Sequence, residues 1–110
     1  MRTLVDGSPL RQAAPSLLEL RSRRDEVLEV CARSGASNVW VFGSLARGEQ
    51  DIDSDVDLVA DIEEDRSLFD LAGLIGELED LLGCPVNVVT RKALGDNPFG
   101  IEVRRDMVAL

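Results

Sequence analysis

The fold is decided by a stretch that reads VFGSLARGEQDIDSDVDL over residues 41–58. Its beginning completes a short β-branched and aromatic run, residues 39–42, which is typical of a buried strand. Gly43 and Ser44 end that strand abruptly, and residues 45–48 can form one helical turn. A glycine lets a ligand approach the backbone closely, and the unpaired N–H groups of the turn, together with the serine hydroxyl, favour an anion. The pattern predicts a small site suited to a terminal phosphate.

The end of the stretch places two acidic residues, Asp55 and Asp57, at the start of a strand predicted over residues 57–62. Residues two apart in a strand face the same side, about 6.6 Å apart along the chain. Their carboxylates can converge on one divalent cation, which would relieve their mutual repulsion. Mg²⁺ is the expected ion, because it takes oxygen ligands and commonly joins one or two carboxylates to phosphates. Asp51 and Asp53 share this parity but lie in the turn, where we expect them to be solvated.

Each half of this pattern also has an ordinary interpretation. Gly-Ser occurs in many turns, and an Asp-x-Asp pair at a strand edge is most often solvated. The combination is much more specific, because the ten residues between Ser44 and Asp55 are enough for the chain to turn back and lay the carboxylates beside the phosphate site. We therefore expect one site that holds a cation together with a phosphate.

Helical patterns flank the stretch. A helix is expected from Pro15 to Gly35, after a loosely ordered segment over residues 1–14. A second helix begins at Ser67, which forms a capping-box pair with Asp70 and precedes an apolar stripe that we interpret as core. The stripe consists of Leu68, Leu71, Ala72, Ile75, Leu78, Leu81 and Leu82.

The remaining elements complete an α/β pattern. Gly83 ends the second helix, residues 86–90 are predicted as a third strand, and residues 98–105 as a last short helix. The apolar tail, residues 107–110, is expected to dock on the body of the protein. Strands interleaved with helices predict an α/β (α+β) fold, a small mixed sheet of about three core strands flanked by helices. Residues 15–110 are expected to form this single domain.

Composition limits the partners. The 110 residues include 21 acidic and 12 basic ones, a formal net charge of −9. Direct nucleic-acid binding and membrane-surface binding are disfavoured, because both need a basic face, whereas a basic protein or a metal–nucleotide complex suits this charge. The absence of histidine excludes Ser-His-Asp and Cys-His catalysis. Cys31 and Cys84 lie among apolar neighbours and are expected to be reduced, buried thiols of a cytoplasmic protein without a signal peptide or membrane span.

The motifs GS at 43–44, ARG at 46–48 and SDVDL at 54–58 resemble the signature of the DNA polymerase β-like nucleotidyltransferase superfamily. The resemblance is greatest to its minimal nucleotidyltransferase (MNT) branch and covers nearly the whole chain. It implies a nucleotidyltransferase fold and an enzyme that uses ATP with Mg²⁺ to move AMP onto a hydroxyl. MNT proteins are typically antitoxins that AMPylate a tyrosine of a HEPN-family ribonuclease toxin, which implies such a toxin as the partner; self-association is left open.

Carried over by position, the resemblance also implies roles for individual residues. Gly43 and Ser44 would hold the triphosphate, and Asp55 and Asp57 would hold the metal ion and serve catalysis. Arg47 would either contact a phosphate or brace the turn.

The sequence departs from the family pattern at Asn87, where the family usually has a third carboxylate. An asparagine can coordinate a cation through its carbonyl oxygen but cannot take a proton from the attacking hydroxyl. Two hypotheses follow. The protein is an AMP-transferring antitoxin, with reduced activity or with a water or partner carboxylate as the base. Alternatively, it is a catalytically impaired antitoxin that neutralises its toxin by binding.

Overall fold

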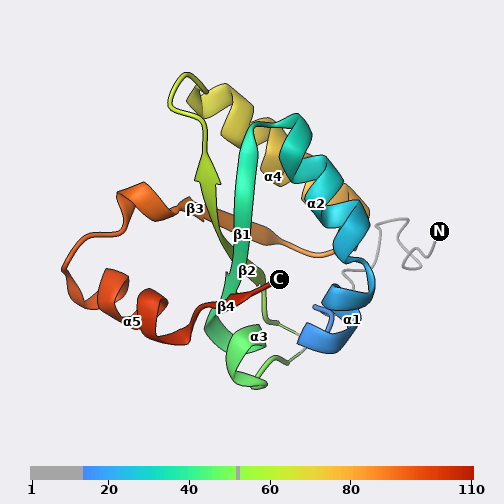
Figure 1. The fold of residues 1–110 in the computed structure, drawn as a ribbon. Helices are drawn as coiled ribbons and strands as arrows, with labels where there is room; N and C mark the ends of the chain where they lie inside the picture. Colours follow the sequence, from blue (N-terminus) through green and yellow to red (C-terminus); the bar gives the residue numbers. More distant parts are fainter. Residues whose placement is uncertain (1–13, 52) are drawn as a thin grey trace, which may run out of the picture.

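A four-stranded mixed sheet forms the centre of the computed structural model, which describes residues 14–51 and 53–110 (Figure 1). The strand order is β3-β2-β1-β4; β1 runs antiparallel to β2 and β4, and β2 runs parallel to β3. The predicted mixed α/β sheet is confirmed, and the apolar tail adds a fourth strand to the three expected. The strands are β1 (Ala36–Phe42), β2 (Val56–Ile62), β3 (Val86–Thr90) and β4 (Val108–Ala109).

The N-terminal helical region differs from its prediction. The expected single helix from Pro15 to Gly35 is two helices, with Ser16 capping the first and Arg23 between them. The Arg23 guanidinium donates to the carbonyl of Leu81 at 2.9 Å, which ties this break to another helix. The predicted loose segment lies outside the described residues except Ala14, which is buried in the core. The helices are α1 (Leu17–Ser22), α2 (Arg24–Arg33), α3 (Gly43–Arg47), α4 (Leu68–Leu82), α5 (Pro98–Asp106) and the 3-10 helix η1 (Arg91–Ala93).

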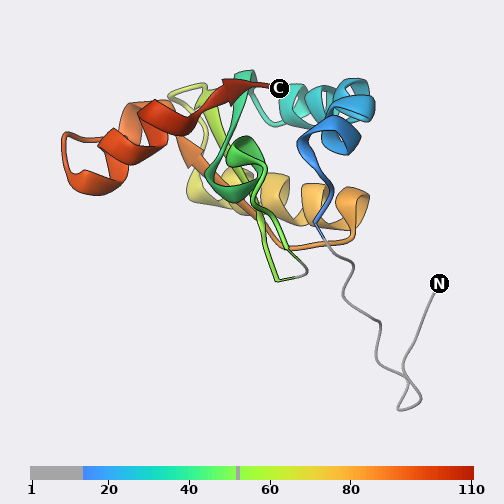
Figure 2. The ribbon, with the colours of Figure 1, turned by 90° about the horizontal axis from the view of Figure 1, so that it is seen from below.

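The two faces of the sheet carry separate apolar clusters. Alternation along β2 sends Val56 and Leu58 to one face, and Asp57 and Val59 to the other. The first face packs under α1, α2 and α4 and contains the larger cluster. The second face carries a smaller cluster that includes Val103 of α5, and α5 lies on the opposite side of the sheet from α2 and α4 (Figure 2). The polar residues of the predicted site are therefore on the α5 side.

The helix α4 follows its predicted ends but not its whole predicted face. The backbone N–H of Asp70 donates to the Ser67 hydroxyl at 3.3 Å, that of Ser67 donates to the Asp70 carboxylate at 2.9 Å, and Gly83 ends the helix with a φ of 71°. The prediction was wrong for Leu68, which is 82% exposed, and for Ala72, which is also exposed. The buried residues of the helix are Leu78 and Leu82, which the predicted stripe includes, and Leu74, which it does not.

Both cysteines are buried and unbridged, as the sequence predicts. Burial raises the pKa of the Cys31 thiol to about 11, so this thiol stays protonated and unreactive at neutral pH. Among the described residues, no helix combines the length and apolarity needed to cross a bilayer.

Candidate active site

The junction of β1 and α3 lies directly against the second of the paired aspartates. Phe42 pairs with Asp57 in the antiparallel β1–β2 register, so the next residue, Gly43, turns beside the Asp57 side chain. A Cβ atom on Gly43 would lie 2.6 Å from Asp57 Oδ2, and the φ of Gly43 is +73°. A glycine is required here for both space and backbone conformation. The Gly-Ser motif and the aspartate pair therefore form one site.

The Asn87 side chain joins the two aspartates. Parallel pairing of β2 with β3 sets Asn87 opposite Asp57, on the same face. Its amide Nδ2 donates to Asp57 Oδ1 at 3.0 Å and lies 3.5 Å from Asp55 Oδ2. One polarised N–H₂ group thus lies beside both carboxylates, in the position where a cation would relieve their repulsion. Asp55, Asp57 and Asn87 are therefore adjacent in space.

Burial dominates the electrostatics of Asp57. It raises the pKa of Asp57 above the ordinary 3.8, because a carboxylate loses hydration when half-buried in the sheet. The Asn87 amide opposes this rise, the charge of Asp55 adds to it, and Arg47 opposes it again. The ionised form of Asp57 is therefore poorly solvated, and a cation would stabilise it.

The serine of the motif is available for a ligand. Ser44 lies in the first turn of α3, no side chain caps that helix, and the Ser44 hydroxyl makes no hydrogen bond to the part of the chain that the structure describes. Because the first N–H groups of a helix have no intrahelical acceptor, they are free to bind an anion beside this hydroxyl. The structure thus leaves donors where the sequence predicts a phosphate.

Arg47 links two helices. Its Nε donates to Glu49 at 2.8 Å and its Nη1 donates to Asp106 of α5 at 2.8 Å, and these two carboxylates raise its pKa. Of the two roles open to Arg47, the observed contacts match the bracing one. Arg47 is also one of the residues that line the cavity described next.

A cavity of about 270 Å³ lies between the β1–α3 junction and α5. Gly43, Ser44 and Asp57 contribute one side of it, and the other side comes from α5. The sequence predicted α5 as a helix but did not indicate which of its residues would line the site. The α5 residues lining the cavity are Phe99, Glu102, Val103 and Asp106.

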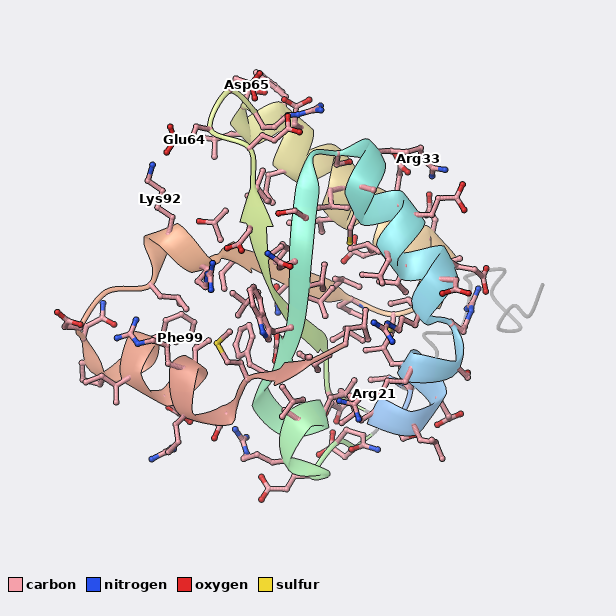
Figure 3. The ribbon with its side chains drawn as sticks, in the orientation of Figure 1. Arg21, Arg33, Glu64, Asp65, Lys92 and Phe99 are labelled. Carbon is pink, nitrogen blue, oxygen red and sulfur yellow. The ribbon has the colours of Figure 1, made fainter. Side chains whose placement is uncertain are left out.

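Another cavity, of about 240 Å³, lies elsewhere on the sheet and contains none of the predicted site residues. Its lining includes Glu64 and Lys92, which Figure 3 shows at the end of the molecule away from α3. The turn residues Asp51 and Asp53 are exposed, as predicted, and the backbone N–H of Asp53 donates to the Asp51 carboxylate.

Residues 24–108 match the family described as the nucleotidyltransferase domain, a span that includes every residue of the site. The chain belongs to the nucleotidyltransferase domain family. It is 44% identical over 66 residues to the protein adenylyltransferase MntA of Thermococcus cleftensis, which covers 60% of this chain and 67% of that protein. This nucleotidyltransferase therefore has relatives named for AMP transfer to proteins.

Solved structures agree with the fold of the nucleotidyltransferase. A structure described as a minimal nucleotidyltransferase superposes with a TM-score of 0.75 at 46% identity, over 87% of this chain and 97% of that one. A toxin–antitoxin structure with AMP-PNP gives a TM-score of 0.66 at 16% identity, over 77% of this chain and 69% of that one. The second likeness establishes a shared fold.

The donor set of the nucleotidyltransferase suits one divalent cation. Asp55 and Asp57 provide carboxylate oxygens that already share one polar neighbour, and Asn87 can turn its carbonyl oxygen to them. Over residues 14–51 and 53–110, no group of three acidic or cysteine side chains is placed to hold a metal ion. The site therefore fits an ion that a triphosphate would help to ligate, rather than one held by protein alone.

Proposed function

We propose that this nucleotidyltransferase uses ATP with Mg²⁺ to transfer AMP to a hydroxyl of a partner protein, a tyrosine of a cognate HEPN-family ribonuclease toxin, and so acts as its antitoxin. The position of the Asp57 carboxylate, where a Cβ on Gly43 would lie 2.6 Å from its Oδ2, carries this proposal, because it sets the predicted phosphate-binding turn beside the paired aspartates. The relative named a protein adenylyltransferase and the toxin–antitoxin structure with AMP-PNP support the same reaction and partner. We assign it to the cytoplasm, a reducing compartment that suits two unbridged thiols.

In this proposal the first turn of α3 and the two aspartates have separate roles. The N–H groups of the first α3 turn and the Ser44 hydroxyl bind the phosphates. Asp55 and Asp57 hold the cation, which when bound stabilises the charge that develops on the phosphates. The acceptor oxygen attacks the α-phosphorus, the α–β phosphoanhydride bond breaks, and pyrophosphate leaves with the electron pair.

The reaction also needs a base that takes the proton of the acceptor hydroxyl. Asn87 occupies the position of the family's third carboxylate, and its neutral amide cannot take that proton. A water or a carboxylate of the partner would then serve as the base, and the rate would be lower than with a third carboxylate. The charge of −9 suits a partner with a basic face, which such a toxin presents to RNA.

A binding-only antitoxin is the second candidate function, and the Asn87 amide favours it. Because this amide donates to Asp57 at 3.0 Å, it offsets part of the cost of burying that carboxylate without a cation. Neutralisation would then come from contact with the toxin alone.

Intact mass spectrometry of the partner separates the two candidates. The purified protein is mixed with ATP, Mg²⁺ and the product of the neighbouring gene, with the partner weighed before and after. AMP transfer predicts an adduct of one AMP that disappears with Asp57→Asn and persists with Asp80→Asn, a matched removal of one exposed charge on α4. A stable complex without an adduct, unaffected by Asp57→Asn, would leave the binding-only function.

A further inference from the structure

The cavity beside Asp57 has two chemically different walls. The wall formed by the β1–α3 junction offers N–H donors and the Ser44 hydroxyl. The α5 wall offers the Phe99 ring and the carboxylates of Glu102 and Asp106. The first wall also carries the Asp57 carboxylate, whose charge a bound cation would offset, whereas the two α5 carboxylates have no such cation. A nucleotide in this cavity would therefore have its phosphates against the first wall and its uncharged part against α5.

The Phe99 ring is held in place yet open to the cavity. It meets the Phe42 ring edge-to-face, with centroids 6.2 Å apart and planes at 82°, and Phe42 is buried. Phe99 itself remains 53% exposed and lies on α5, as Figure 3 marks. The backbone at the next residue packs closely against the preceding loop, because a Cβ on Gly100 would lie 2.1 Å from the carbonyl oxygen of Gly95. An accessible aromatic ring is a stacking platform for a flat base.

Glu102 lies one helical turn after Phe99 and lines the same cavity. Its carboxylate forms no hydrogen bond or ion pair with residues 14–51 or 53–110. The neighbouring acid, Asp106, is already engaged by Arg47 at 2.8 Å and by Arg105 at 3.6 Å. Glu102 is therefore the α5 carboxylate that remains able to accept a hydrogen bond from a ligand.

We propose that α5 reads the nucleobase: Phe99 stacks on it, and the Glu102 carboxylate accepts a hydrogen bond from its exocyclic amino group. Adenine, cytosine and guanine carry such a group, whereas uracil has none, and a carboxylate repels the carbonyl oxygens on both sides of its N3–H. The site would thus select amino-bearing nucleoside triphosphates against UTP. This inference rests on the proposed function in one respect, that a nucleoside triphosphate occupies this cavity.

Equilibrium binding of ATP and UTP, each with Mg²⁺ and without any partner, tests the proposal. The wild-type protein is expected to bind ATP roughly tenfold more tightly than UTP, the effect of one hydrogen bond to a charged acceptor. Glu102→Gln should bring the two affinities close together, because the amide can donate to a uracil carbonyl. Phe99→Leu should weaken both nucleotides alike. Glu29→Gln, which removes one exposed charge on α2, controls for net charge and should leave the ratio unchanged.

The outcomes separate this inference from the proposed function. Glu102 is exposed, so its variant is expected to fold, and circular dichroism verifies this for Phe99→Leu as well. Equal affinities for ATP and UTP in the wild type, or an unchanged ratio in Glu102→Gln, would overturn base reading and leave AMP transfer intact. Binding of neither nucleotide would overturn base reading and also remove the nucleotide on which the proposed reaction depends.

Discussion

At the scale of single residues, Asn87 connects the two aspartates of the candidate site. Its amide lies between Asp55 and Asp57 and supplies a partial positive charge without a metal ion. The resemblance of the sequence to its family implied a place for Asn87 beside the aspartates, and the structure sets Asn87 opposite Asp57. The sequence could not predict the direction of the amide, which depends on atoms contributed by two strands at once.

Asn87→Asp is expected to make folding dependent on a divalent cation. Three carboxylates would then face one another, so we expect a lower melting temperature in EDTA and a larger rise on adding Mg²⁺ than the wild type gives. Differential scanning fluorimetry measures both. Asn38→Asp is the matched control, because the Asn38 amide also donates to a carboxylate, that of Asp61 at 2.9 Å. The control variant should lose stability and should not recover it when Mg²⁺ is added. If Mg²⁺ restored both variants, the assignment of a cation site to Asp55 and Asp57 would be contradicted.

The raised pKa of Asp57 predicts a dependence of stability on pH. In the folded protein, burial keeps the proton on Asp57 at pH values where the unfolded chain, with a pKa near 3.8, has released it. The free energy of unfolding should therefore fall as pH rises from about 3.8 through the raised value. Asp57→Asn removes this decline. In urea titrations with EDTA, we expect the variant to gain stability relative to the wild type as pH rises. Parallel curves of unfolding free energy against pH for the two proteins would refute the burial effect.

At the scale of secondary-structure elements, the end of β1 and the start of α3 show how a strand–helix junction becomes a binding site. Gly43 adopts a φ that other residues avoid and leaves room for the Asp57 carboxylate. The α4 glycine Gly76 has the opposite surroundings, because a Cβ added there would have no neighbouring atom within 4 Å. The same substitution should therefore have opposite effects at the two positions.

Gly43→Ala is expected to lower the free energy of unfolding by about 1–2 kcal/mol, the cost of a left-handed backbone for a residue with a Cβ. Gly76→Ala should raise it by about 0.5–1 kcal/mol, because alanine favours a helix and the site is unobstructed. Urea denaturation compares the two variants with the wild type. A Gly43→Ala protein as stable as the wild type would argue against the crowding of Asp57.

The elements themselves were largely predictable where local signals are strong. The capping box at Ser67, the glycine stop at Gly83 and the strand over residues 86–90 follow from local chemistry. The break at Arg23 and the two-residue strand β4 did not, because each depends on a distant partner, the carbonyl of Leu81 and the edge of β1. For the same reason, the contribution of α5 to the site is visible in the structure alone.

At the scale of the whole molecule, the sheet separates two apolar clusters. The larger contains Leu74 and faces α4, whereas the smaller contains Phe42, Val59 and Val103 and supports the cavity. Phe42 connects that cluster to both the Gly43 turn and the Phe99 ring. The smaller cluster, which supports the site, is therefore separate from the larger cluster, which provides most of the core.

Leu74→Ala should reduce the free energy of unfolding by about 2–5 kcal/mol, through lost burial and the cavity it leaves. The affinity of the remaining folded protein for ATP should not change. Val103→Ala should cost less stability, since valine is smaller, but should weaken ATP binding. Urea denaturation and calorimetry at a temperature where both variants are folded measure the two effects; weakened ATP binding in Leu74→Ala would contradict the separation.

This arrangement has a consequence for how the protein can change over generations. Substitutions beneath α4 are expected to change how much folded protein a cell holds, while those beneath α5 are expected to change the candidate site. Selection can thus adjust abundance and specificity almost independently. A change on the α5 side can thus alter the site while the packing on the other side of the sheet is left as it was.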